Sequence, residues 1–185
     1  CRNRHCPKCG ALAKAEWLEK QKVHLLPTHY FHVVFTIDHA FNPIARVNQK
    51  AVYDLLFRSA AAALKAFGRR HLGGEIGFTA ILHTWGQTLS EHIHLHCLVP
   101  GGALSADGKR WRGTAPDFLF PIEALSAQFR DLFCAGMSDL YRSGQLRFAG
   151  QSAVYAEADA FRRLLAGAQA KKWQVYAKPP FGEAA

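Results

Sequence analysis

The segment His92–Leu104 reads HIHLHCLVPGGAL, and it begins by alternating histidines with apolar residues. Side chains along a β-strand point alternately to the two faces of a sheet. We therefore expect His92, His94 and His96 to project from one face, while the apolar residues between them enter the core. Residues two apart on a strand lie about 6.5–7 Å apart, so two imidazoles could converge on one metal ion. Three consecutive histidines on one face are typical of a metal site rather than of a solvated surface.

Other short segments rich in aromatic and β-branched residues are expected to form strands around this one. Glu75–Gly86 (EIGFTAILHTWG) is separated from His92 by the residues QTLSE, which suit a hairpin loop, so we expect two antiparallel neighbours. Tyr30–Ile37 (YFHVVFTI) is a further strand, and the Asp-Gly turn in Ser105–Arg112 (SADGKRWR) leads into a short one. We also expect strands at Leu146–Phe148 and Trp173–Ala177, the last ending before Lys178-Pro179-Pro180.

Helices are predicted between these strands. Ala11–Leu26 is rich in helix formers, and Leu12, Trp17 and Leu18 are expected to pack on one side of it. Apolar residues recur at three-to-four spacing in three further segments, which are expected at Ala45–Arg70, Pro121–Arg142 and Glu157–Gln169. The mixture of strands and helices predicts an α+β fold around an antiparallel sheet.

The first ten residues hold a cysteine cluster of the form C-x4-C-x2-C. Cys1, Cys6 and Cys9 are spaced for a tetrahedral zinc site, with His5 as a possible fourth ligand and Gly10 permitting a tight turn after the knuckle. A redox pair is the alternative, but no thioredoxin-like strand precedes these cysteines. Clustered thiols among basic residues fit a reducing compartment. Because the chain begins at Cys1 and not at Met, we expect it to be a fragment or a processed piece of a longer protein.

Composition and charge exclude several classes of protein. Hydrophobic residues make up 49% of the 185 residues, which excludes a disordered chain, and no apolar run approaches the ~18 residues of a membrane span. No signal peptide is visible. The net charge is +9; residues 1–74 carry 12 Lys+Arg and 4 Asp+Glu (+8), and residues 75–185 carry 11 and 10 (+1). We expect a polyanion to dock on the N-terminal part, although the charge could also serve solubility alone.

Five ordered stretches together resemble the IS91-type insertion-sequence transposases, a branch of the HUH nucleases. They are HLHCLVPGG (His94–Gly102), LHTWGQ (Leu82–Gln87), CRNRHCPKC (Cys1–Cys9), YFHVVFTIDH (Tyr30–His39) and WQVYAKPPFG (Trp173–Gly182). The resemblance implies the HUH-nuclease fold, an antiparallel sheet with the histidine strand in its centre, packed by amphipathic helices. It also implies a partial zinc-binding segment with a linker helix over residues 1–26 and a catalytic core over residues 27–185.

The resemblance further implies one Mg2+ or Mn2+ ion held by His94 and His96 and by a third polar ligand. If residues 82 and 96 face each other, Gln87 is favoured as that ligand; a register slip of one residue would favour His83 instead. His92 is a register-compatible alternative. The ion would polarise a phosphate of single-stranded DNA while a tyrosine hydroxyl attacks, leaving a 5′-phosphotyrosine and a free 3′-hydroxyl.

The nucleophile of such enzymes is one tyrosine, or a Tyr-x-x-x-Tyr pair, on a helix after the segment that matches KPPFG. No two tyrosines of this chain are four apart, and Tyr176 is expected to pack in the sheet. We therefore expect the nucleophile outside the chain. The resemblance also implies a further Cys pair upstream of Cys1. The chain is thus interpreted as a transposase piece that is cut at both ends and inactive without its tyrosine.

The implied partner is single-stranded DNA at insertion-sequence ends, in the bacterial cytoplasm and associated with the nucleoid through DNA, with no membrane contact. Trp85 and Trp111 could stack on bases, but core packing is the stronger expectation for both. Three alternatives remain: a zinc-containing DNA-binding module or inactive remnant, a plasmid replication initiator, and a zinc hydrolase using His92, His94 and His96. Candidate phosphate contacts come from basic residues near the zinc segment and after the histidine strand, namely Arg2, Arg4, Lys8, Lys14, Lys109, Arg110 and Arg112.

Overall fold

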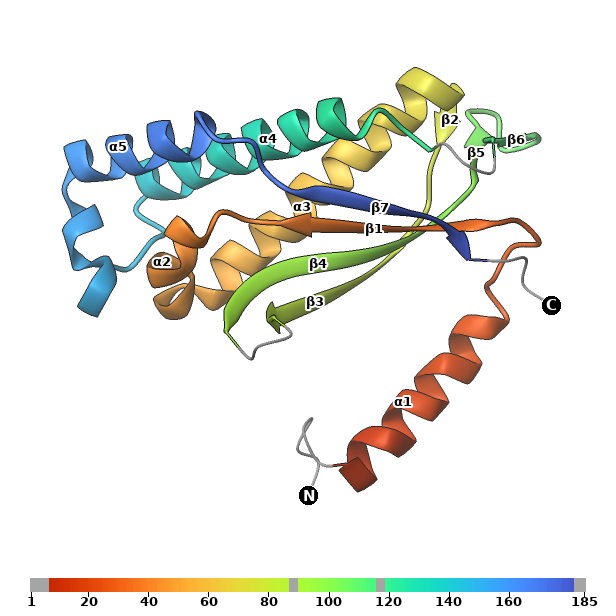
Figure 1. Ribbon diagram of the computed structural model, residues 1–185, viewed down its shortest axis with the longest axis horizontal. Helices are drawn as coiled ribbons and strands as arrows, with labels where there is room; N and C mark the ends of the chain where they lie inside the picture. The colour runs from red at the N-terminus through yellow and green to blue at the C-terminus, as the bar shows by residue number, and fades with distance from the viewer. Residues whose placement is uncertain (1–6, 87–89, 116–118, 182–185) are drawn as a thin grey trace.

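A computed structural model describes residues 7–86, 90–115 and 119–181, and its centre is a four-stranded antiparallel sheet (Figure 1). The strand order is β3-β4-β1-β7, so the histidine strand β4 is an inner strand, as predicted. Inner strands are paired along both edges, which makes them the most firmly placed part of a sheet. The four strands are β1 (Tyr30–Thr36), β3 (Thr79–Trp85), β4 (Glu91–Pro100) and β7 (Val175–Phe181).

Helices cover one face of this sheet and leave the other face open (Figure 1). The buried residues of α3 recur at three-to-four spacing, and they pack with the apolar face of α4 and the inward side chains of β1 and β4 into one core. Gly136 on α4 allows a close approach, since a Cβ there would collide with Leu55 of α3. The covering helices are α2 (Asn42–Val47), α3 (Gln49–Phe67), α4 (Ile122–Arg142) and α5 (Ala158–Gln169), with 3-10 turns at His39–Phe41 and Gly150–Ala156.

A second, three-stranded sheet sits at one end of the molecule. It pairs β2 (Gly74–Glu75), β5 (Gly102–Ser105) and β6 (Trp111–Gly113) in the order β2-β5-β6. Gly108, with a φ of 68°, forms the predicted Asp-Gly turn between β5 and β6. The predicted strand at residues 75–86 is therefore two strands, β2 and β3, in different sheets. The strand predicted at residues 92–104 is likewise divided, because Gly101 separates β4 from β5.

Asn48 accounts for two differences between prediction and structure. Its φ and ψ of −133° and 39° are not helical, so the helix predicted over residues 45–70 is broken into α2 and α3. The Asn48 amide donates to the carbonyl oxygens of Ile44 (2.9 Å) and Arg147 (2.8 Å), and its oxygen accepts from the backbone N–H of Arg147 (2.8 Å). Because this side chain satisfies the backbone of Arg147, the segment Leu146–Phe148 is held as a loop, and the predicted strand there is wrong.

Three element ends also differ from prediction. β7 continues through Pro179 and Pro180, which is tolerated because β7 is the edge strand next to β1 among the residues that the structure describes. A short π-helix, Gly68–Leu72, ends the long helix, and Gly73 follows it in the left-handed conformation (φ 61°). The first helix, α1, spans Pro7–Lys22 rather than Ala11–Leu26, with the proline at its first position.

Helix α1 stands away from the helical layer (Figure 1). Leu12, Trp17 and Leu18 are exposed rather than packed as predicted, and the last two line a groove of about 330 Å³ with Thr79 and Leu98 of the sheet. In the part of the chain that the structure describes, no helix is long and apolar enough to span a membrane.

Candidate metal centre

The open face of the sheet carries a cavity of about 690 Å³ that all four strands line. β4 supplies three of its histidines, because alternation places His92, His94 and His96 on this face, as predicted. The residues between them are buried in the core on the opposite face. A single strand thus joins the apolar core to a cavity lined by histidines.

The register of β3 against β4 adds another histidine to this face. His83 lies directly opposite His94, and Leu82 lies opposite Leu95, so the arrangement in which residue 82 faces residue 96 does not occur. Directly opposed residues point to the same face of a sheet. His83 is therefore beside the histidines of β4, and Gln87 lies outside the described residues.

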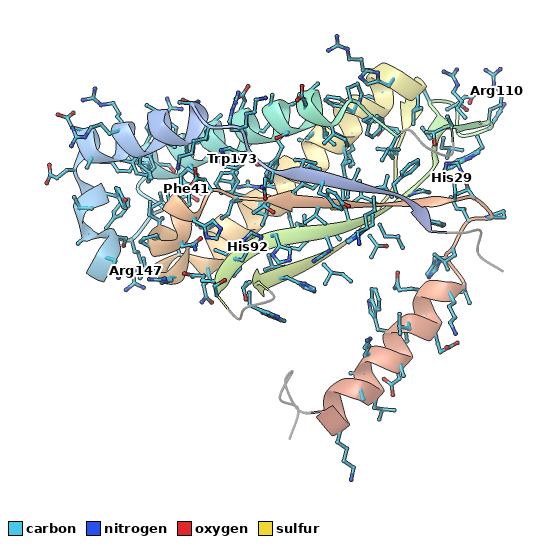
Figure 2. The ribbon with its side chains drawn as sticks, in the orientation of Figure 1. His29, Phe41, His92, Arg110, Arg147 and Trp173 are labelled. Atoms are coloured by element: carbon cyan, nitrogen blue, oxygen red, sulfur yellow. The ribbon has the colours of Figure 1, made fainter. Side chains whose placement is uncertain are left out.

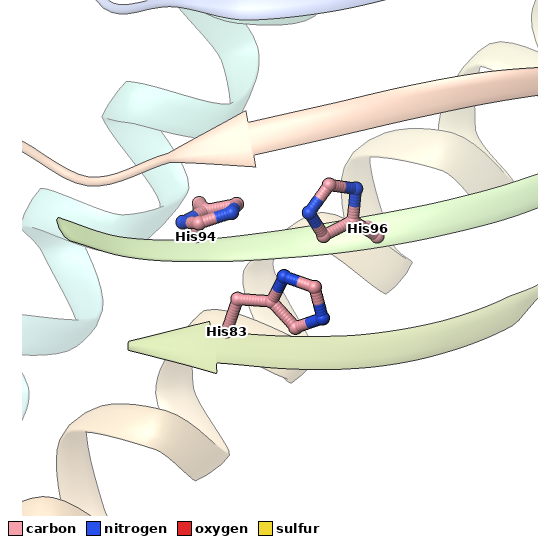
Figure 3. Close-up of side chains that lie close together, drawn as sticks. All are labelled: His83, His94 and His96. Atoms are coloured by element: carbon pink, nitrogen blue, oxygen red, sulfur yellow. The ribbon is translucent and has the colours of Figure 1, made fainter. Parts of the chain in front are cut away.

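His83, His94 and His96, which we call the triad, each offer a ring nitrogen, and these three atoms lie within 4.8 Å of one another (Figure 3). The ring centroids are 5.3 Å apart for His83 and His94, 4.3 Å for His83 and His96, and 4.8 Å for His94 and His96. Three converging imidazoles form a set that can hold a divalent transition-metal ion such as Mn2+.

Hydrogen bonds orient two of the three rings. Nδ1 of His94 is 2.8 Å from the backbone carbonyl oxygen of His92, and that oxygen can only accept. His94 therefore carries its proton on Nδ1 and keeps the lone pair of Nε2 for a ligand. Nδ1 of His96 is 2.6 Å from Nε2 of His32 on β1.

Burial favours the neutral, metal-binding state of His83 and His96. Burial, and then the nearby imidazoles of His83, His94 and His32, lower the pKa of His96 to about 4. Burial and the neighbouring His94 also lower the pKa of His83. A cation binds the unprotonated nitrogen, so these rings are available at neutral pH without first losing a proton.

His92 lies beside the triad and has a different partner. Its Nδ1 is 3.1 Å from Nε2 of His39, which follows β1 in the chain. Burial lowers the pKa of His92, and the neighbouring His94 and His39 add to the effect. Within the described residues, the group of converging metal-ligand atoms contains His83 and not His92.

Family models match most of the chain. Residues 77–185 match the family described as "Putative transposase", and residues 1–37 match "Transposase zinc-binding domain". The chain belongs to this transposase family. The resemblance to transposases expected from the sequence is thereby confirmed. The antiparallel sheet with the histidine strand inside it confirms the predicted fold class.

Two curated relatives extend the likeness over nearly the whole chain. Putative transposase y4qJ of Sinorhizobium fredii (strain NBRC 101917 / NGR234) is 49% identical over 183 residues, covering 98% of this chain and 46% of the relative. The transposase for insertion sequence element IS801 of Pseudomonas savastanoi pv. phaseolicola is 30% identical over 181 residues, covering 95% and 41%. The chain therefore spans about half the length of the curated relatives it matches.

A solved structure shares the fold of the transposase chain. The conjugative relaxase TrwC in complex with mutant oriT DNA matches 65% of this chain and 48% of its own, with a TM-score of 0.50 and 17% sequence identity. This likeness concerns the fold alone.

Aromatic residues on the cavity differ from expectation. Tyr176 is in a strand, as predicted, but it lies on the open face opposite Val34, lines the cavity and is 55% exposed, so the expectation that it packs in the sheet is wrong. Trp85 lines the same cavity, is 40% exposed and stacks on His83, with ring planes 9° apart. Trp111 is 42% exposed on β6. Core packing was therefore the wrong expectation for both tryptophans.

The zinc residues predicted in the first segment of the transposase lie mainly outside the described residues. Cys1, His5 and Cys6 are in that part, as are Arg2 and Arg4. The backbone of Cys9 and Gly10 is within α1, so Gly10 continues a helix rather than forming the predicted tight turn.

The predicted DNA-contacting residues fall into two separate groups. Lys8 and Lys14 are exposed on α1, whereas Lys109, Arg110 and Arg112 are exposed around the β5–β6 turn. Figure 2 places Arg110 at the end of the molecule far from His92. The structure therefore does not bring the hairpin cations to the triad.

Two histidines that sequence reasoning did not assign to the site contact it. His32 and His39 lie on or just after β1, within the stretch YFHVVFTIDH. The sequence spacing of these two histidines does not indicate a metal site. They contact the site only because β1 pairs with β4. That pairing sets Val34 opposite His96, and the sequence does not specify it.

Proposed function

We propose that this chain is the catalytic part of a transposase that nicks and rejoins single-stranded DNA on the open face of its sheet. The observation that carries the proposal is the triad of His83, His94 and His96 on a transposase-family chain. His83 takes the place of Gln87 as the proposed third ligand, with His94 and His96 as the other two. The proposed ion is Mg2+ or Mn2+; three nitrogen ligands favour Mn2+ over the harder Mg2+.

The chain's own residues would act by holding and orienting. A divalent cation bound at the triad would supply Lewis-acid polarisation of a DNA phosphate. The lowered pKa of His96 keeps that ring unprotonated, and the carbonyl of His92 fixes the ring of His94. Trp85, beside the triad, offers a face for stacking a base of the bound strand.

The proposed chemistry is a transesterification. A tyrosine hydroxyl oxygen loses its proton and forms a bond to phosphorus while the bond from phosphorus to the 3′ oxygen breaks. The 3′ oxygen takes up a proton and leaves as a 3′-hydroxyl, so the step gains and loses no proton overall. The 5′ end stays on the tyrosine as a phosphodiester, so the reverse reaction can rejoin strands without another energy source. The proposed substrates are the ends of an insertion sequence in the bacterial cytoplasm.

The nucleophile is proposed to come from a segment that follows residue 185. Within this chain, Tyr176 is the tyrosine that lines the cavity. It lies across β1 from His96, two strand spacings or about 9.6 Å away at the backbone. That separation favours a role in contacting the DNA strand over attack at a triad-bound phosphate.

We further propose that residues 1–26 form a zinc-binding segment with a linker helix, joined to a core of residues 27–185. Cys1, Cys6 and Cys9, with His5 as a possible fourth ligand, are the proposed structural zinc ligands. The match of residues 1–37 to a transposase zinc-binding domain supports this, as does the position of α1 away from the helical layer. The basic residues near this segment are proposed to contact phosphates.

The test uses a longer protein that includes this chain and matches the length of its relatives. It is mixed with single-stranded insertion-sequence ends and Mn2+. A covalent protein–DNA adduct that survives denaturation is expected, and His94→Ala is expected to reduce its yield at least about 100-fold, because partners that merely support a ligand already contribute 10- to 100-fold. His71→Ala, an exposed histidine away from the cavity, is the control and should leave the yield unchanged.

Tyr176→Phe separates the two positions for the nucleophile. The adduct is expected to persist in this variant, and its loss would place the nucleophile at Tyr176. Salt-sensitive binding of DNA without any adduct, with every metal tried, would instead support a DNA-binding module without cleavage. An adduct of unchanged yield in His94→Ala would contradict the proposed ligand.

A further inference from the structure

His32 lies outside the triad but contacts one of its members directly. It stands on β1, diagonally across from His96, since Val34 is the residue paired with His96 and His32 is paired with Leu98. Nε2 of His32 and Nδ1 of His96 are 2.6 Å apart, and the two ring planes are nearly parallel, at 8°. This is a short hydrogen bond between two imidazoles, in which one nitrogen must donate and the other must accept.

The direction of this bond decides which nitrogen of His96 can bind a metal ion. A neutral imidazole has one N–H and one lone pair. With Nδ1 engaged by His32, the nitrogen of His96 left for a metal is Nε2, which must then carry the lone pair. Nδ1 of His96 must therefore hold the proton and donate it to Nε2 of His32.

His94 and His96 are thus oriented by different kinds of acceptor. His94 donates its Nδ1 proton to the backbone carbonyl of His92, which no substitution of a side chain removes. His96 has a side-chain acceptor on the neighbouring strand, so its orientation depends on the identity of residue 32. Partners that fix the tautomer and direction of a metal-binding histidine typically contribute 10- to 100-fold in metal affinity.

We propose that His32 is a positioning residue that accepts the Nδ1 proton of His96 and so directs Nε2 of His96 at the metal. The inference rests on the metal site of the proposed function. For this positioning, residue 32 needs only a hydrogen-bond acceptor at the place that Nε2 of His32 occupies. We therefore predict that the acceptor can be supplied by a different side chain of similar reach.

The experiment measures Mn2+ binding to the 185-residue protein after chelator treatment, from the electron paramagnetic resonance signal of free Mn2+. His32→Leu, which removes the acceptor, is expected to weaken binding 10- to 100-fold. His32→Gln, whose side-chain oxygen reaches about as far as Nε2, is expected to stay within about threefold of wild type. His71→Leu removes an exposed histidine elsewhere and controls for weak binding to surface imidazoles.

A second readout gives the proton position directly. The 15N shifts of the histidine rings, assigned with His96→Gln, are expected to show His96 protonated on Nδ1 in the metal-free protein and His32 unprotonated on Nε2. In His32→Leu this fixed tautomer of His96 should be lost. A purely structural role for His32 would not predict that change, and circular dichroism checks that the variants are folded.

The possible outcomes separate this inference from the proposed metal site. Unchanged Mn2+ affinity in His32→Leu, or equal weakening in His32→Leu and His32→Gln, would overturn the positioning role. Absence of Mn2+ binding in the wild type would contradict the proposed metal site itself. In that case the ring shifts still decide the bond, and a His96 protonated on Nε2 overturns the inference.

Discussion

The two faces of the four-stranded sheet share one backbone but have opposite surroundings. On the covered face, Leu95 is 0% exposed and packs with the side chains of α3 and α4. On the open face of the same sheet, Ile81 is 44% exposed, and the triad lines a cavity. Stability is therefore concentrated on one face, which leaves the other free to bind ligands at little cost to the fold.

The first prediction concerns a substitution in the core on the covered face of the sheet. Leu95→Ala is expected to lower the free energy of unfolding by about 2–5 kcal/mol, because it removes a fully buried side chain and leaves a cavity in a core that can relax only in part. The change is measured by urea denaturation. Although Leu95 lies between His94 and His96, its side chain points away from them, so Mn2+ affinity should be kept where the protein is folded.

Ile81→Thr is the matched change on the open face. It keeps a β-branched side chain on an exposed strand position, and the expected loss of stability is about 0.5 kcal/mol or less. A loss as large as that of Leu95→Ala would mean that the open face is also packed. The inference that stability is concentrated on the covered face would then be wrong.

The second prediction tests whether the open face binds single strands. Trp85→Ala is expected to weaken the affinity for single-stranded DNA by about 1–3 kcal/mol, the contribution of one stacked base, while the free energy of unfolding changes little. The measurement is fluorescence anisotropy at fixed salt with a chelator present, so that effects of metal binding do not enter.

Trp85→Phe keeps an aromatic plane and should retain most of the affinity. Equal losses in the Ala and Phe variants would show that the ring does not stack on a base. A large loss with Trp111→Ala and none with Trp85→Ala would move the DNA-binding surface to the β5–β6 hairpin.

The two faces also differ in how much of their structure could be predicted from the sequence alone. Alternation along β4 correctly assigned His94 and Leu95 to opposite faces, because the period of two is a local property. The pairing of His83 with His94 and of Val34 with His96 is not local, and it depends on how strands slide against each other. The third histidine of the triad and the contact from His32 could therefore not be fixed in advance.

Long-range side-chain contacts explain the errors in the elements. Apolar spacing predicted a continuous helix through Asn48, and Leu146–Phe148 was expected to be a short strand. The side-chain amide of Asn48 hydrogen-bonds to the backbone of Arg147, 99 residues away. The helix is interrupted at Asn48, and Leu146–Phe148 is a loop instead of a strand. Local propensity carries no information about such a contact.

The third prediction concerns acid, and it is expected to act through the open face. The pKa of His96 is about 4 in the folded protein, chiefly because of burial, against an ordinary value of 6.5. Between these values the unfolded chain binds a proton that the folded protein does not. Stability from this residue is therefore complete above about pH 6.5 and declines as the pH falls toward 4. Because the ring is partly exposed, solvent screening reduces the effect to about 1 kcal/mol.

The measurement is urea denaturation of wild type and His96→Gln between pH 7.5 and pH 4.5, without metal. Wild type should lose more stability over this interval than His96→Gln, which has no imidazole to protonate at that position. Leu95→Ala should keep the wild-type pH dependence, since its change lies on the covered face. Equal slopes for wild type and His96→Gln would show that His96 protonates as readily in the folded protein as in the unfolded chain. Addition of Mn2+ should steepen the wild-type slope, because protons and the ion compete for the same nitrogens.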